Sequence, residues 1–148
     1  MPDMDYLKQI EEFCHEKGIV FIVDEVQTGF GRCGTLFAHE LFDVKPDIMT
    51  MAKGIGGGVP MGAILATEKV AAAFVPGDHG TTFGGGPLVC AAANAVLDTF
   101  DEENILDNVN EVGEYFISEL KKLDNEVIAD VRGKGLMVGV ELTKPGAE

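Results

Sequence analysis

Apolar residues follow two kinds of pattern along this chain, short unbroken runs and longer stretches with helical spacing. Residues 19–23 (IVFIV) form a β-branched run that is typical of a strand buried on both faces, as in a parallel sheet. Residues 47–52 (DIMTMA), 62–67 (GAILAT) and 136–142 (LMVGVEL) predict further short strands. We therefore expect a sheet built from short segments spread along the chain.

The remaining apolar positions predict helices. Either Asp3 or Asp5 is a capping residue for a first helix that ends at Gly18. Pro87 suits the first turn of an alanine-rich helix. Apolar residues recur every three or four positions over residues 105–123, which predicts a long amphipathic helix. Shorter helices are expected near residues 36–42 and 68–74. Because strands alternate with helices, the pattern predicts an α/β fold.

Composition and charge narrow the classes of function. The chain has 148 residues, of which 46% are hydrophobic and 24% charged, a globular composition. Its net charge of −14 makes nucleic acid and anionic membrane surfaces poor partners. We therefore expect no nucleic-acid partner and no membrane attachment, and no apolar stretch is long enough to cross a bilayer. The 3 cysteines are far apart, which argues against disulfides and zinc and favours the cytoplasm.

Clusters of glycines indicate turns with unusual backbone conformations, and one cluster matches a nucleotide-binding motif. Residues 29–34 (GFGRCG) match the pattern G-x-G-x-x-G of dinucleotide-binding proteins. However, the apolar run of the preceding strand ends well before Gly29, and Asp24 and Glu25 would repel a pyrophosphate. A structural glycine-rich turn is the preferred interpretation, and a nucleotide-binding protein is the less favoured one.

Two charged residues directly follow predicted strands, where open α/β sheets bind ligands. Asp24 either caps a turn or holds a cationic ring nitrogen. Lys53 precedes the glycine-rich residues 54–58 and is either a solvated lysine or, once desolvated, a nucleophile that forms a Schiff base. Strand alternation points Glu25 to the opposite face from Asp24, so the two carboxylates are not an acid/base pair.

A second glycine-rich loop carries two hydroxyls. Thr81 and Thr82 lie in the segment GTTFGGG, where hydroxyls and backbone amides can bind phosphate, although an ordinary flexible loop is an equal interpretation. His15, His39 and His79 show no spacing typical of metal ligands, so we expect no metal.

Several longer segments carry a family resemblance. They are FIVDEVQTGFGRCG (21–34), KPDIMTMAKGIGGGVPMGAI (45–64), HGTTFGGGPLVCAAA (79–93) and VRGKGLMVGVEL (131–142). In this order they resemble the class III aminotransferases, which use pyridoxal phosphate on the fold-type I scaffold. Within that family they look most like acetylornithine and ornithine aminotransferases.

The resemblance implies roles for individual residues. Lys53 resembles the lysine that forms the Schiff base with pyridoxal phosphate and later moves the α-proton. Asp24 resembles the carboxylate that keeps the pyridine nitrogen protonated. Val26 resembles the residue packed under the ring, and Gln27 the one that hydrogen-bonds its phenolic oxygen. Thr82, with Thr81 beside it, resembles the hydroxyl that reaches the cofactor phosphate of a neighbouring subunit, which implies a homodimer with shared active sites.

The resemblance also implies a domain organisation. Residues 1–108 would be the C-terminal half of the cofactor-binding large domain, a mostly parallel sheet flanked by helices. Residues 109–148 would be the linking helix and the first strand of a small α+β domain. Members of the family are much longer, so we expect a fragment without the main phosphate-binding turn, the aromatic residue on the ring and the arginine that binds the α-carboxylate.

The function implied is transamination of an ω-amino compound, such as N-acetylornithine or ornithine, with 2-oxoglutarate. A decarboxylase or aminomutase of the same fold and a non-catalytic dimerisation module are the alternatives.

Overall fold

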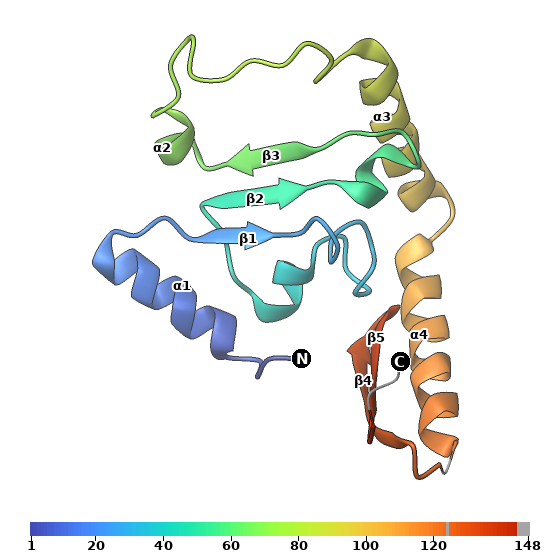
Figure 1. Ribbon diagram of the computed structural model, residues 1–148. Coiled ribbons are helices and arrows are strands. Elements are labelled where there is room, and N and C mark those ends of the chain that lie inside the picture. Colours follow the sequence, from blue (N-terminus) through green and yellow to red (C-terminus); the bar gives the residue numbers. More distant parts are fainter. Residues whose placement is uncertain (124, 145–148) are drawn as a thin grey trace.

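The computed structural model describes residues 1–123 and 125–144. A small sheet, in the strand order β1–β2–β3, is flanked by helices, and a separate hairpin, β4–β5, packs on a long helix (Figure 1). The elements are α1 (Tyr6–Lys17), β1 (Ile22–Asp24), the 3₁₀ helix η1 (Ala38–Phe42), β2 (Ile48–Met51), the 3₁₀ helix η2 (Lys53–Gly56), β3 (Ala63–Ala66), α2 (Glu68–Ala71), α3 (Pro87–Glu102), α4 (Ile105–Lys122), β4 (Ile128–Lys134) and β5 (Met137–Leu142).

The sheet is mixed in its strand directions. β1 and β2 run parallel, with Asp24 opposite Thr50, and β2 and β3 run antiparallel, with Met51 opposite Ala63. Parallel strands end at the same edge of a sheet, so the residues that follow β1 and β2 meet there. The predicted α/β class is confirmed, and this edge is where the candidate site lies.

Strand β1 is shorter and more exposed than its apolar run predicts. The backbone N–H of Phe21 donates to Asp47 Oδ2 at 2.9 Å, and that of Ile19 donates to a carbonyl in the last turn of α1 at 2.8 Å. Both amides therefore bond acceptors outside the sheet, so residues 19 and 21 do not extend the strand. Ile22 is 56% exposed, so the expected burial on both faces is wrong for this chain. No element among the described residues covers that side of Ile22.

Helix α1 is tied to the loop before β2 through a buried carboxylate. It ends at Gly18, whose φ of 65° lies in the left-handed region, as the sequence predicts. The Glu11 side chain accepts hydrogen bonds from Lys8 Nζ and the Lys45 amide, both at 2.7 Å. Burial alone would raise the pKa of this carboxyl, but these hydrogen bonds and the Lys8 charge hold it below its ordinary value.

The hydrophobic core lies on one face of β2. Met49 and Met51 are buried there with Ile55, and Phe30 and Phe37 from the loop after β1 pack against them. The two phenyl rings meet edge to face, with centroids 5.6 Å apart. This packing fixes the loop over the edge of the sheet at which β1 and β2 end.

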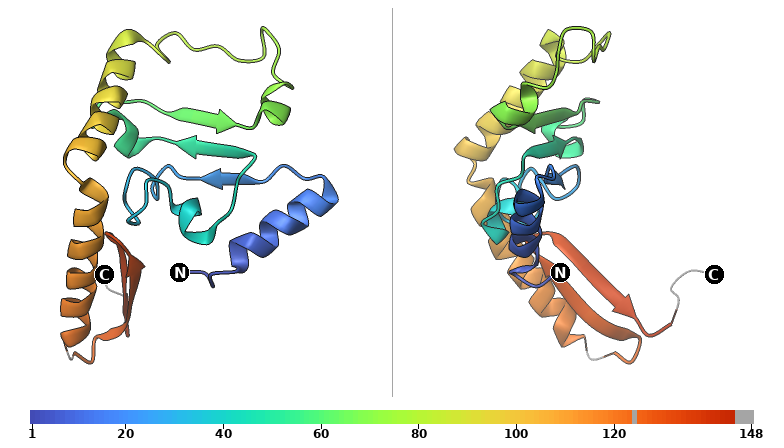
Figure 2. Two further views of the ribbon diagram at one scale, coloured as in Figure 1. Left: turned by 180° about the vertical axis from the view of Figure 1, so that it is seen from behind. Right: turned by 90° about the vertical axis from the view of Figure 1, so that its left-hand side faces the viewer.

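Helices α3 and α4 follow one another along one side of the molecule (Figure 2). Asn104, with a left-handed φ of 51°, separates them. The predicted boundary between residues 108 and 109 falls inside α4, and the division into two domains stays a prediction. Across the described ranges, neither of these helices nor any other is long and apolar enough to span a bilayer.

No local pattern predicts strand β4, which pairs antiparallel with the predicted closing strand β5. Its sequence, IADVRGK, has no apolar run because charged residues and a glycine interrupt it. Arg132 in β4 instead forms ion pairs with Asp130 at 2.8 Å and with Glu141 of β5 at 2.6 Å. Cross-strand partners thus supply what the local pattern lacks.

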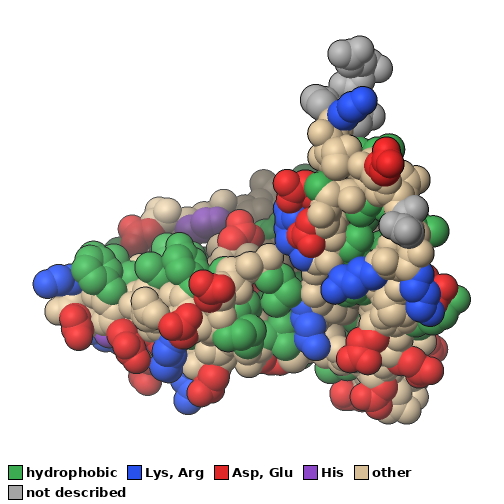
Figure 3. Space-filling model, turned by 90° about the horizontal axis from the view of Figure 1, so that it is seen from below, with side chains coloured by type: hydrophobic (Ala, Val, Ile, Leu, Met, Phe, Trp, Pro, Cys, Tyr) green, Lys and Arg blue, Asp and Glu red, His purple; other side chains and the backbone are tan. Residues whose placement is uncertain are grey.

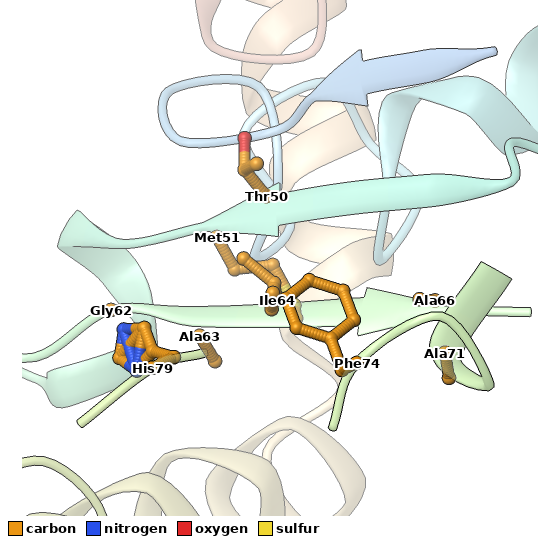
Figure 4. A pocket seen from close by; sticks show the side chains of 9 residues that line it. All are labelled: Thr50, Met51, Gly62, Ala63, Ile64, Ala66, Ala71, Phe74 and His79. Carbon is orange, nitrogen blue, oxygen red and sulfur yellow. The ribbon is translucent and has the colours of Figure 1, made fainter. Parts of the chain in front are cut away.

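Apolar surface remains open on several faces. In the space-filling view from below, apolar side chains lie between acidic ones along the α1 side (Figure 3). Tyr6 and Phe13 of α1 are each more than half exposed. A hollow of about 650 Å³ lies against β2 and β3, where Ile64 and Phe74 are also more than half exposed (Figure 4). Thr50 Oγ1 is buried at this hollow without a hydrogen-bond partner among the described residues.

We expect the 148-residue chain to associate in solution, because apolar patches and a short sheet with open edges favour contact with other surfaces. Light scattering at micromolar concentration should show dimers or larger species. Ile22→Lys should reduce the apparent mass, whereas Asn108→Lys, at an exposed polar position of α4, should not. A monomer at all concentrations would contradict this expectation.

Candidate active site

A cleft of about 410 Å³ lies at the edge where β1 and β2 end. One wall is the loop after β1, another is the start of η2, and the third is the turn of the β4–β5 hairpin. Its lining includes Val26, Gln27, Arg32, Lys53, Leu136 and Met137. Three of the predicted cofactor residues, Val26, Gln27 and Lys53, therefore meet in one cleft, although Lys53 comes 26 positions after Gln27.

Lys53 is the first residue of η2 and has an unusual backbone conformation, with a φ of 49°. Its Nζ donates a hydrogen bond to Gln27 Oε1 at 2.8 Å. The next residue, Gly54, packs so closely on Phe30 that a Cβ there would lie 2.8 Å from the Phe30 Cβ. The backbone around the lysine is thus closely packed, whereas its side chain is exposed, and the described residues do not supply the desolvation of a reactive amine.

Asp24 ends β1, and its Oδ1 accepts the backbone N–H of Val26 at 2.9 Å. The turn-cap interpretation of this residue is therefore confirmed. Asp24 lines a neighbouring cavity of about 320 Å³ rather than the cleft itself. Its role toward a ring nitrogen stays a prediction, and the second carboxylate oxygen has no hydrogen-bond partner among the described residues.

The glycine motif of residues 29–34 serves the fold. A Cβ on Gly29 would lie 2.8 Å from the Glu25 carbonyl oxygen, so only glycine fits the turn. Gly31 and Gly34 have φ values of 81° and 91°, which favour glycine. The Gly34 carbonyl also accepts a hydrogen bond from Asn110 Nδ2 of α4 at 2.8 Å. These contacts support the interpretation of a structural turn over that of a dinucleotide site.

Sequence reasoning missed the importance of Glu25, which is 0% exposed. Its carboxylate accepts hydrogen bonds from Thr28 Oγ1 and from the His39 backbone N–H, the latter at 2.7 Å. The His39 ring approaches the same carboxylate, with Nδ1 3.2 Å from Oε1. Glu25 is buried whereas Asp24 is exposed, as alternation predicts, but both residues line the same cavity of about 320 Å³. No local signal in the sequence connects Glu25 to a histidine in η1.

Thr81 and Thr82 do not join the cleft. They lie in the exposed loop between α2 and α3, and β3 lies between this loop and β2 in Figure 1. Thr81 Oγ1 accepts the Gly84 backbone N–H at 3.1 Å, so it stabilises the loop. The predicted contact with a cofactor phosphate of another subunit stays a prediction.

The groups around the cleft fit an aromatic aldehyde such as pyridoxal phosphate. Lys53 supplies a primary amine, which condenses with an aldehyde. Gln27 turns Oε1 toward that amine, which leaves Nε2 as a donor for an anionic ring oxygen. Val26 adds an apolar surface, and Asp24, which lines the neighbouring cavity, supplies a carboxylate of the kind that suits a protonated ring nitrogen.

Comparisons with known proteins agree with this geometry. The model of the family described as Aminotransferase class-III, whose enzymes depend on pyridoxal phosphate, matches residues 1–148. The acetylornithine aminotransferase of Methanosarcina mazei is 53% identical over 98% of this chain and 36% of its own length. Ornithine aminotransferase 2 of Staphylococcus saprophyticus is 49% identical over 97% of this chain and 37% of its own length.

A solved structure agrees as well. The crystal structure of the acetylornithine aminotransferase from Elizabethkingia anophelis superposes with a TM-score of 0.92 at 40% identity, and the match covers 97% of this chain and 37% of that one. The chain thus spans little more than a third of the length of the relatives it matches.

The burial of Cys33 and the exposure of Cys90 predict different reactivities for the two thiols. Burial raises the pKa of the Cys33 thiol, and the nearby Glu25 carboxylate raises it further. We expect exposed Cys90 to react rapidly with iodoacetamide at mildly alkaline pH, whereas Cys33 reacts only after unfolding. Peptide mass mapping over time measures both rates, and equal rates in the folded chain would contradict the prediction.

Proposed function

Because this chain belongs to the class III aminotransferases, we propose that it forms part of the active site of a pyridoxal-phosphate-dependent aminotransferase. The observation that carries the proposal is the 2.8 Å hydrogen bond from Lys53 Nζ to Gln27 Oε1, at the edge where β1 and β2 end. This hydrogen bond joins the amine predicted to bind the cofactor to the amide predicted to bind its ring. Aminotransferase activity of the whole protein is part of the same proposal.

The side chains of this cleft would divide the work. Pyridoxal phosphate, when bound, supplies an electron sink for the bonds at the substrate carbon that bears the reacting amine. Lys53 Nζ would hold the cofactor covalently and, once displaced by the substrate amine, move the proton at that carbon. Asp24 would keep the ring nitrogen protonated through charge. Gln27 would orient Nζ and donate to the ring oxygen, while Val26 would support the ring.

We propose an ω-amino compound such as N-acetylornithine or ornithine as the amino donor and 2-oxoglutarate as the acceptor. The names of the relatives, acetylornithine and ornithine aminotransferase, support this choice. The apolar hairpin residues Leu136 and Met137 form a wall of the cleft against which the aliphatic part of such a donor can pack. Widely spaced free cysteines support a reducing compartment such as the cytoplasm.

We further propose a homodimer in which the loop of Thr81 and Thr82 contributes to the cofactor site of the second subunit. The loop is exposed, and it carries Phe83, whose 85% exposure suits a contact between subunits. The large-domain and small-domain assignment of residues 1–108 and 109–148 belongs to the same proposal.

Borohydride reduction in the presence of pyridoxal phosphate should label Lys53 ahead of the other lysines, because the Gln27 amide orients its amine. Peptide mass mapping identifies the labelled residue. Lys53→Met should remove the main label, whereas Lys45→Met should leave it in place. A label spread evenly over the surface lysines would overturn the proposed role.

Asp24→Asn should slow proton removal at the substrate carbon that bears the reacting amine by about 10²-fold or more while leaving covalent attachment of the cofactor intact, because a neutral amide cannot stabilise a charged ring nitrogen. The test uses an enzyme of the relatives' length that carries this sequence, and NMR measures exchange with solvent of the proton on that carbon. Asp5→Asn is the control, because the Asp5 carboxylate lies beside α1 and accepts a hydrogen bond from Gln9 Nε2. Near-normal exchange in Asp24→Asn would remove this role.

A further inference from the structure

The turn that presents Val26 and Gln27 contains a fully buried carboxylate. Glu25 is 0% exposed, although a buried carboxylate is costly unless hydrogen bonds compensate for its lost hydration. Here both oxygens are used, Oε2 by the Thr28 hydroxyl and Oε1 by the His39 backbone N–H and ring. The arrangement is therefore well satisfied within the chain.

The backbone of Glu25 closes the same turn. Its N–H donates to the Thr50 carbonyl of β2 at 2.9 Å, and its carbonyl accepts the Gly29 N–H at 3.0 Å. The first bond joins the turn to β2, and the second closes residues 26–28 into a short loop. The Glu25 side chain also bonds the third residue of this loop, Thr28. Gln27 lies inside this closed loop.

The other end of the network is anchored in the core. His39 lies in η1, and its ring stacks on Phe37 with centroids 6.0 Å apart. Phe37 in turn packs on Phe30 beside the buried methionines of β2. Glu25 therefore connects the turn to residues that pack on the hydrophobic core.

We propose that Glu25 is a positioning residue, whose buried carboxylate fixes the 26–28 turn and thereby holds the Gln27 amide against Lys53 Nζ. This inference rests on the proposed function for the use that Lys53 makes of the contact. The carboxylate itself does not reach the cleft, so it acts through Thr28 and the backbone rather than on a substrate.

Glu11 provides a matched control. It is also a buried glutamate, 6% exposed, and it also accepts a side-chain and a backbone hydrogen bond. Its contacts join α1 to Lys45 and do not touch the cleft. Both Glu25→Gln and Glu11→Gln should lower the stability of the chain, because each alters a buried carboxylate. Only Glu25→Gln should also change the turn that carries Gln27.

Amide hydrogen exchange tests the positioning without any cofactor. In Glu25→Gln, the hydrogen-bonded amides of Val26 and Gly29 should exchange about tenfold faster than in the parent chain, because the turn opens locally more often. In Glu11→Gln their exchange should stay unchanged. Equal exchange in the two variants, or no change in Glu25→Gln, would overturn the inference.

Reactivity of Lys53 provides a second readout that a purely structural role would not move. With pyridoxal phosphate and borohydride, Glu25→Gln should lower the rate of Lys53 labelling about tenfold relative to a surface lysine, while Glu11→Gln should not. Unchanged labelling in Glu25→Gln would overturn the effect on Lys53.

Thr28 variants decide the matter if Glu25→Gln does not fold. Thr28→Val removes the hydroxyl and should reproduce both the faster amide exchange and the slower Lys53 labelling. Thr28→Ser keeps the hydroxyl and should show neither effect. Effects shared by Thr28→Val and Thr28→Ser would overturn the inference. If the parent chain shows no preference for Lys53, the proposed function fails, and hydrogen exchange alone then decides the positioning role.

Discussion

The parallel pairing of β1 with β2 is the constraint on which the candidate site depends. With Asp24 opposite Thr50, both strands end at one edge, and the turns that follow them are forced together. Lys53 reaches Gln27 only because of this register. An antiparallel pairing of the same strands would place the start of η2 at the opposite edge from the turn after β1.

Close contacts at glycines attach the hairpin to this edge. A Cβ on Gly113 of α4 would collide with the backbone of Gly135, and one on Gly135 would lie 2.6 Å from the Cys33 carbonyl carbon. The Leu136 N–H donates to the Arg32 carbonyl at 2.9 Å across the same contact. Two parts of the chain with separate sheets therefore share one cleft, and a side chain at these glycines would push the walls apart.

Charge is arranged locally rather than by the overall balance of the chain. The net charge is −14, yet the two charged side chains that line the cleft, Arg32 and Lys53, are both cations. The carboxylate nearest in sequence to the turn, Glu25, is directed into the interior and hydrogen-bonded there. A local excess of positive charge suits an anionic cofactor or substrate, which the total charge alone would disfavour.

The sequence by itself determined the features that depend on short-range pattern. Apolar runs located β2, β3 and β5, helical spacing located α4, and Gly18 marked the end of α1. Lys53, together with Val26 and Gln27, was found through its place after a strand and through the family motif, and the structure brings the three into one cleft.

Only the tertiary structure decided the features that depend on distant partners. Glu25 bonds His39, which is 14 positions away, and Asn110 bonds Gly34, which is 76 positions away. β4 exists because β5 pairs with it, and the short length of β1 depends on the Asp47 carboxylate, which accepts the Phe21 N–H. Periodicity and turn chemistry act over a few residues, whereas a buried hydrogen bond is specified by the positions of both partners in space.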